Sequence, residues 1–254
     1  MTGVSTNRKG VNSVETFKLG KHGVQIPAVC GSVMGPDIET MQAGAARAID
    51  QGADLIELRI DGLRDPTGWE KLLPPKVPVI LTNRPEREGG GFKGDENKRV
   101  EVLLQGIARE VSCIDIELST PEPLRERVIS QAKKSGVTVL MSHHDFSTTP
   151  SIKVLIEMTK RLARAGCDLA KIVTFAEDRK DALRILDFLA QVQDEVAIPL
   201  IAFAMGDAGR ITRIAAPVFG SPIVYAAAGE ATAPGQFDVA TMKRLLSELI
   251  LKGR

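Results

Sequence analysis

The length, composition and charge of the chain favour one large domain and exclude some partners. The chain has 254 residues, a length typical of one α/β barrel, and 43% of them are hydrophobic. Its 33 lysines and arginines nearly cancel its 32 aspartates and glutamates, and only 4% of residues are aromatic. Nucleic-acid binding needs a basic patch, often interleaved with aromatic rings, and a membrane span needs a long apolar run. The sequence has neither, so we expect no nucleic-acid or membrane partner.

In chain order, the first predicted element is a β-hairpin, and eight strand-and-helix units follow it. Residues 1–14 are polar and predict a flexible tail, and residues 15–26 predict the hairpin. Apolar runs typical of buried parallel strands lie at 27–34, 55–61, 77–83, 113–118, 137–144, 169–175, 199–205 and 222–228. A helix is expected after each run, and a period near 3.6 residues marks helices at 37–51, 96–110, 122–135, 151–165, 178–196 and 237–251.

Eight consecutive units predict a single (β/α)8 TIM barrel, an α/β fold, over residues 15–254. A doubly wound sheet is the alternative, but it rarely runs to eight repeated units in this length. In the barrel we expect the hairpin to close the N-terminal end. The cysteines Cys30, Cys113 and Cys167 occur singly beside apolar runs, which predicts buried, reduced thiols and a cytoplasmic protein.

Lys171 is the most unusual residue, because it interrupts the apolar run at 169–175. A lysine kept out of water has its ammonium form disfavoured, so its amine becomes a nucleophile toward carbonyl groups. One unit upstream, His143 and His144 end another apolar run, and a histidine can move protons near neutral pH. Imine chemistry with acid–base help is one interpretation. The other is a lysine that snorkels from a strand end, with histidines in an ordinary turn.

Charged residues also follow strand periodicity. Glu57, Arg59 and Asp61 alternate with apolar residues, so they should point into the barrel lumen and be paired or bind a polar ligand. Asp115 and Glu117 share one face of their strand and offer counterions to lumen cations, which favours a structural charge network.

The ends of the third, seventh and eighth strands carry further candidates. Arg84 could bind an anion, and Glu88 could reach back over the barrel mouth. Arg213 could hold a phosphate or pair with a substrate carboxylate. Residues 232–236 are small and hinge-like, as in a lid, although a plain surface loop is the alternative.

A metal site is disfavoured. Neighbouring strand residues face opposite ways, so only one of His143 and His144 can line the lumen while the strand continues. The chain has three histidines and no HxH or HExxH spacing.

The sequence resembles the type I 3-dehydroquinate dehydratase family. The resemblance rests on Asp115-Ile116-Glu117-Leu118 followed, after twenty residues, by Val139-Leu140-Met141-Ser142-His143-His144-Asp145. It covers most of the chain after the tail, and its further matches are Ser32 to Gly35, Glu57 to Arg59, Arg84, Glu88 to Gly90, Lys171, Met205-Gly206, Arg213 and Ala233 to Gln236.

The resemblance implies a mechanism for three residues. Lys171 would attack the C3 ketone of 3-dehydroquinate and form an imine. His144 would help to form and hydrolyse the imine, remove the C2 proton and protonate the departing C1 hydroxyl, giving 3-dehydroshikimate by syn loss of water. Glu88 would orient His144 and support its protonated state.

The resemblance also implies a substrate-binding set and no metal or organic cofactor. Arg213 would grip the substrate carboxylate, and Glu57, Arg59, Arg84 and Gln236 would hold the ring hydroxyls, with Ser32, Met205 and Thr232 as lesser contacts. We expect serine where the chain has Thr232, which keeps the hydroxyl. A homodimer is implied.

Two alternative functions remain. The runner-up is a class I aldolase, which predicts phosphate binding after the seventh and eighth strands. The third possibility is a barrel kept only as a binding module, although this predicts loss of the lysine or the histidine.

Overall fold

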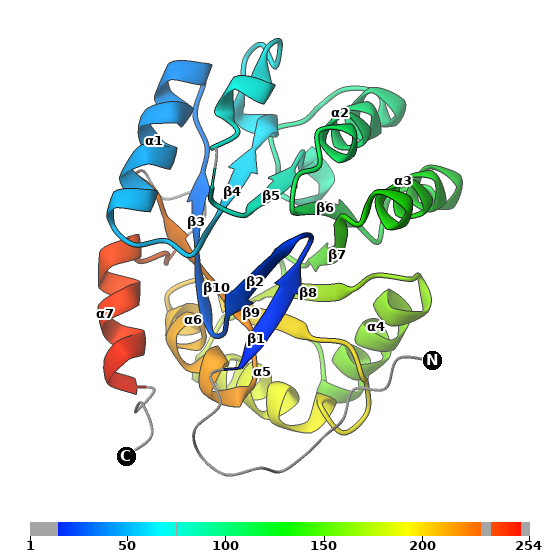
Figure 1. The fold of residues 1–254 in the computed structure, drawn as a ribbon. Helices are drawn as coiled ribbons and strands as arrows, with labels where there is room; N and C mark the ends of the chain where they lie inside the picture. Colours follow the sequence, from blue (N-terminus) through cyan, green and yellow to red (C-terminus); the bar gives the residue numbers. More distant parts are fainter. Residues whose placement is uncertain (1–14, 75, 230–234, 250–254) are drawn as a thin grey trace.

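The computed structural model describes residues 15–74, 76–229 and 235–249, and these form a (β/α)8 barrel (Figure 1). The first seven of eight parallel strands pair in chain order, and the eighth pairs with the first, so the sheet curls into a nearly closed barrel. The strands are β3 (Ala28–Val33), β4 (Leu55–Arg59), β5 (Val79–Thr82), β6 (Cys113–Glu117), β7 (Thr138–His144), β8 (Leu169–Phe175), β9 (Leu200–Met205) and β10 (Ile223–Ala227).

Helices cover the outside of the barrel, as the apolar faces of the strands require. Ile56 and Leu58, for example, are fully buried in the layer between strands and helices. Asp37 and Asp178 cap their helices by accepting hydrogen bonds from first-turn N–H groups, and Gly136 ends another in a left-handed conformation. The helices are α1 (Ile38–Asp50), α2 (Glu96–Ala108), α3 (Glu122–Ser135), α4 (Ile152–Arg164), α5 (Arg179–Val192) and α7 (Val239–Leu249).

The prediction of a helix after every strand is wrong in one unit. Between β4 and β5 the described residues form only two 3-10 helices, Ile60–Gly62 and Trp69–Leu72. Proline and glycine at 66 and 68 interrupt this segment, and Gly68 has a φ of 78°. The predicted strand 55–61 is shorter in the structure, because Ile60 and Asp61 belong to the first 3-10 helix. Between β9 and β10 the helix is short: α6 spans Thr212–Ala215 and is flanked by two 3-10 helices, Ala208–Ile211 and Ala216–Phe219.

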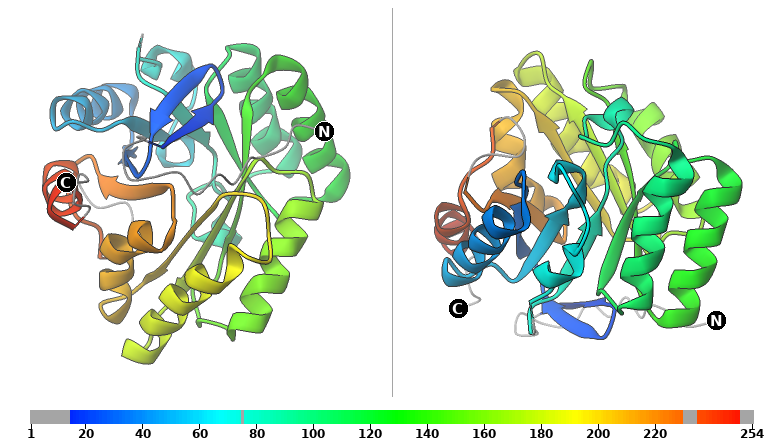
Figure 2. Two further views of the ribbon diagram at one scale, coloured as in Figure 1. Left: turned by 60° about the horizontal axis from the view of Figure 1, so that its bottom comes forward. Right: turned by 90° about the horizontal axis from the view of Figure 1, so that it is seen from above.

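The predicted hairpin is confirmed and closes the N-terminal end of the barrel. It consists of β1 (Thr16–Leu19) and β2 (His22–Gln25), paired antiparallel, and Figure 2 shows it lying across one end of the barrel. Its Leu19, which is fully buried, packs in one cluster with residues that begin the strands, including Ala28, Leu55, Cys113, Leu169 and Ile223. The other end of the barrel, where the strands end, is therefore the open one.

Two further expectations can be compared with the described residues. Among them, no helix has the length and hydropathy needed to cross a membrane. Cys30, Cys113 and Cys167 are buried free thiols, as the sequence predicted. Burial raises the pKa of the Cys167 thiol to about 12, which keeps it protonated and unreactive. The predicted tail at 1–14 lies outside the described residues.

Candidate active site

The lumen of the barrel is built in layers, and its lower layers are apolar. Alternate strands contribute the side chains of one layer in this fold. The strand registers place Glu57, Asp115, Lys171 and Tyr225, from β4, β6, β8 and β10, in one such layer above the apolar floor. Three of these four side chains are charged, so polar chemistry starts at this level of the lumen.

Lys171 lies at the centre of this layer. The residue is only 4% exposed, and its Nζ is 3.4 Å from Asp115 Oδ2 and 3.7 Å from Glu57 Oε1. The ring centroid of Tyr225 is 3.9 Å from the same nitrogen, a distance at which an aromatic face attracts a cation. Lys171 is therefore a lumen residue with two counterions, and the snorkelling alternative is wrong.

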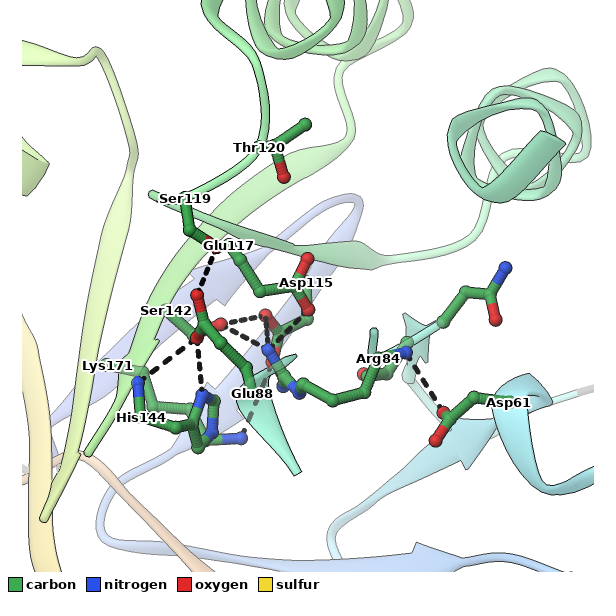
Figure 3. A network of polar contacts seen from close by, with 12 residues as sticks. Asp61, Arg84, Glu88, Asp115, Glu117, Ser119, Thr120, Ser142, His144 and Lys171 are labelled. Atoms are coloured by element: carbon green, nitrogen blue, oxygen red, sulfur yellow. Dashed lines mark hydrogen bonds and ion pairs between the residues drawn. The ribbon is translucent and has the colours of Figure 1, made fainter. Parts of the chain in front are cut away.

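Arg84 binds both carboxylates of β6, that of Asp115 in this layer and that of Glu117 further along the strand (Figure 3). Its Nη2 is 2.5 Å from Asp115 Oδ2, and its Nη1 is 2.6 Å from Glu117 Oε1. All three side chains are almost completely buried. Burial alone would raise the pKa of Asp115, but Arg84 and Lys171 outweigh it and hold that pKa below its usual value. The predicted charge network on β6 is confirmed.

Glu57 is fixed by residues of the two adjacent strands, and Arg59 by a residue that follows its own strand. Ser32 Oγ and Thr82 Oγ1 donate hydrogen bonds to the two oxygens of Glu57, at 2.7 and 2.9 Å. Arg59 forms a two-pronged ion pair with Asp61, with distances of 2.9 and 2.7 Å. Glu57 and Arg59 thus point into the lumen as predicted. Asp61 instead follows β4 in a 3-10 helix and accepts hydrogen bonds from the backbone N–H groups of Arg84 and Gly91.

His144 and Glu88 meet at the barrel mouth, as the sequence implied. The Nδ1 of His144 lies 3.1 Å from Glu88 Oε2. However, burial, followed by the charges of Arg84, Lys171 and Arg59, lowers the pKa of His144 well below its usual value. The neutral imidazole is therefore favoured, and the role of Glu88 in supporting the protonated form stays a prediction.

Arg213 lies in the same pocket under an aromatic ring. Its guanidinium carbon is 4.5 Å from the centroid of Phe203. Burial lowers the pKa of Arg213 to about 10, so the side chain stays cationic near neutral pH. A cation that little water reaches suits an anionic ligand group.

One pocket collects the predicted site residues. Ten of the eleven line it; the eleventh, Thr232, lies with most of the predicted lid outside the described residues. The ten are Ser32, Glu57, Arg59, Arg84, Glu88, His144, Lys171, Met205, Arg213 and Gln236. Sequence reasoning missed five lining residues, Gly89, Phe146, Val173, Phe203 and Tyr225. Strand periodicity could have found three of these, because Val173, Phe203 and Tyr225 continue lumen-facing positions of their strands.

His143, next to His144, is absent from the lining of that pocket, in agreement with the alternation along the strand. Among the described residues, no three histidines, cysteines, aspartates or glutamates gather in a way that could hold a metal ion.

The fold and the site together define a (β/α)8-barrel enzyme, with a buried lysine and a histidine–carboxylate pair facing one polar pocket. The profile of the type I 3-dehydroquinase family matches residues 29–251. The chain belongs to this family, whose members are lyases of the dehydration step in the shikimate pathway.

Individual relatives agree with this assignment. The chain is 39% identical to a 3-dehydroquinate dehydratase of Methanothermobacter thermautotrophicus over 225 residues, which are 87% of this chain and 97% of that protein. It is 34% identical to the Methanococcoides burtonii 3-dehydroquinate dehydratase over 240 residues, 92% of this chain and 97% of that one. The crystal structure of the Geobacillus kaustophilus 3-dehydroquinate dehydratase is similar with a TM-score of 0.85 at 28% identity, covering 92% of this chain and 96% of that one.

Proposed function

We propose that the chain dehydrates 3-dehydroquinate to 3-dehydroshikimate through an imine on Lys171. The observation that carries the proposal is a lysine 4% exposed, within 4 Å of two carboxylates, in the same pocket as His144. The ammonium of Lys171 first gives a proton to the neutral imidazole of His144, and the amine adds to the C3 ketone. The carbonyl oxygen then leaves as water with that proton and one more from the nitrogen, which leaves a cationic iminium. The iminium withdraws electrons from C2 and makes the C2 proton acidic.

His144 is proposed as the proton carrier, and its lowered pKa supports this role. A neutral imidazole can accept the C2 proton, whereas an imidazolium cannot. The electron pair of the broken C–H bond then moves through the enamine and expels the C1 hydroxyl, which leaves as water with the proton that His144 returns. Hydrolysis of the remaining iminium frees the product and restores the amine of Lys171.

The remaining pocket residues are proposed to orient the substrate. Arg213 is a buried cation that suits the carboxylate. The hydroxyls of the ring are proposed to contact Glu57, Arg59, Arg84 and Gln236, and Ser32, Met205 and Thr232 are proposed as lesser contacts. Orientation of this kind lowers the barrier because the reacting groups are held in place before reaction.

Trapping of the imine tests the proposal. The wild-type protein is incubated with 3-dehydroquinate and sodium borohydride, and the adduct is mapped by mass spectrometry while absorbance of the enone product is followed. We expect a reduced adduct on Lys171, none in Lys171→Met, and an unchanged adduct in the control Lys93→Met, since Lys93 has a 74% exposed side chain. Absence of both the adduct and the enone in the wild type would refute the proposal.

We also propose a cytoplasmic homodimer. Buried free thiols fit a reducing compartment. Exposed apolar side chains, such as Leu183, Ile211 and Val218 at 65%, 54% and 59% exposure, provide surface that a second copy could bury. Light scattering after gel filtration tests the dimer, and cell fractionation of the native protein tests the compartment.

A further inference from the structure

Arg99 is a fully buried arginine outside the barrel lumen. It projects from α2, the helix that packs on β5 and β6. Its Nε donates to Glu96 Oε2 at 2.6 Å, its Nη1 to the carbonyl oxygen of Asn83 at 2.9 Å and its Nη2 to Thr120 Oγ1 at 2.7 Å. The guanidinium is therefore held in one orientation by hydrogen bonds to the first turn of its own helix and to residues that follow β5 and β6.

The locked guanidinium reaches Glu117, which lies between two arginines. Arg84 Nη1 is 2.6 Å from Glu117 Oε1 on the lumen side, and Arg99 Nη1 is 2.7 Å from Glu117 Oε2 on the outer side. The second contact is a charge contact: among the described residues, Glu117 Oε2 accepts no hydrogen bond. Arg99 thus acts on Glu117 through its charge.

Glu117 needs this compensation because it is completely buried. Burial raises its pKa to about 7, against the lowering effect of Arg84 and Arg99, while Asp115 and Glu88 raise it further. Removing one neighbouring cation should therefore raise the pKa of Glu117 further and favour its neutral form.

Resting on the proposed function, we propose that Arg99 is a positioning residue of the reaction: its charge keeps Glu117 ionised, and ionised Glu117 fixes Arg84 for binding the substrate hydroxyls. Neutral Glu117 would no longer balance the charge of Arg84, whose guanidinium would keep only its hydrogen bonds to Asp115 and Ser142. A loosened Arg84 weakens binding and affects KM before it affects the chemistry at Lys171.

Four charged groups act on Glu117: Arg84 and Glu88 from the β5–α2 connection, Arg99 from α2 and Asp115 from β6. Further charged groups lie on the other neighbouring elements: Arg125 on α3 bonds the Leu118 carbonyl, and His144 on β7 and Lys171 on β8 contact Glu88 and Asp115. Arg99 is the outermost cation in direct contact with the Glu117 carboxylate, so it can be changed without touching the pocket lining.

The pH dependence of KM tests the proposal. In the wild type we expect KM to rise as the pH falls through about 7, where Glu117 takes up its proton. Arg99→Met should move this transition up by about one pH unit and raise KM roughly threefold at pH 7.5, because a rise of one pKa unit lowers the ionised fraction of Glu117 about threefold midway between the two pKa values. Arg99→Lys should restore most of the loss, and kcat should change little.

Three further variants separate this effect from a structural one. Glu117→Gln should show a raised KM without the transition, and adding Arg99→Met to it should change KM little further. Arg109→Met, at the exposed end of α2, should behave as wild type. A transition that persists in Glu117→Gln, or a wild-type profile in folded Arg99→Met, overturns the proposal.

A spectroscopic measurement keeps this test independent of turnover. The Glu117 carboxyl carbon is followed by NMR during pH titration, and its midpoint should lie higher in Arg99→Met and stay near the wild-type value in Arg99→Lys. An equal midpoint in wild type and Arg99→Met overturns the inference. If the wild type instead forms no adduct on Lys171 and no enone, the proposed function fails while the titration still reports on Arg99.

Discussion

One carboxylate oxygen of Glu88 accepts two hydrogen bonds from His144, one from its backbone N–H and one from its ring Nδ1, each 3.1 Å long. The other oxygen of Glu88 accepts a hydrogen bond from Ser119 Oγ. The ring bond assigns the proton to Nδ1 and leaves Nε2 as the nitrogen with a free electron pair. Glu88 therefore fixes the tautomer of His144 as well as its place at the mouth.

Replacing Glu88 by glutamine should lower kcat about 10- to 100-fold, as losses of a partner that orients a functional histidine commonly do. The amide can present its N–H to Nδ1 and stabilise the wrong tautomer. Steady-state kinetics measure the effect, and Glu86→Gln, an exposed neighbour, serves as the control. Equal kcat values for the two variants would show that His144 needs no orientation by Glu88.

The depressed pKa of His144 predicts a pH dependence of stability. The unfolded chain binds a proton on this histidine near pH 6.5, whereas the folded chain does so only at lower pH. The contribution is therefore fully present above pH 6.5 and is lost as the pH falls from there toward the folded pKa. Urea unfolding at pH 7.5 and pH 5 should show a smaller loss in His144→Asn than in the wild type. The same loss in both proteins would contradict a depressed pKa.

Two glycines in the left-handed conformation provide a matched pair. A Cβ on Gly89 would lie 2.0 Å from Phe146 Cζ, and Phe146 stacks on His144 with ring centroids 6.4 Å apart. A Cβ on Gly136 meets nothing within 4 Å. Alanine at either position should cost ~1 kcal/mol of stability, because both φ angles are positive. Only Gly89→Ala should also lower kcat/KM, by roughly 10- to 100-fold, because the new Cβ would displace Phe146 and with it His144 at the barrel mouth. Thermal melts and kinetics of both variants decide this.

Asp115→Asn should destabilise the protein by about 3–5 kcal/mol, because it removes the carboxylate that Arg84 and Lys171 share in a buried site. The measurement is the free energy of unfolding at neutral pH. Glu110→Gln is the control: its ion pair with Lys21 is exposed and should contribute at most about 1 kcal/mol. A small effect at both positions would mean that the lumen cations are compensated elsewhere.

Alternation and spacing predicted the barrel, the hairpin and the lumen charges, because in a closed sheet a side chain's face follows from its position along the strand. Glu57 was predicted for that reason, whereas Lys171 stood out because it interrupts an apolar run. Tyr225 was missed, since an aromatic residue in an apolar run is expected in any core. Arg99 was missed because its role depends on which strand end its helix covers, a tertiary relationship that local periodicity does not contain.

The charge state of His144 also went beyond the sequence. The resemblance implied a carboxylate partner. The lowering of the His144 pKa, however, depends on burial and on three nearby cations, and so on distances between four different strand ends. The missing helix after β4 has a more local cause, the turn at Pro66 and Gly68. The sequence analysis extended the helical period of the other units to this one.

In the part of the chain that the structure describes, the hairpin closes the N-terminal end of the barrel and leaves the opposite end as the opening to the lumen. Leu19 and the apolar floor fill the lumen below the layer of Lys171. Any compound that reaches the lysine must therefore leave by the way it entered, past His144 and Phe146. Substrate and product use the same opening one after the other, so a product molecule that has not yet left excludes the next substrate.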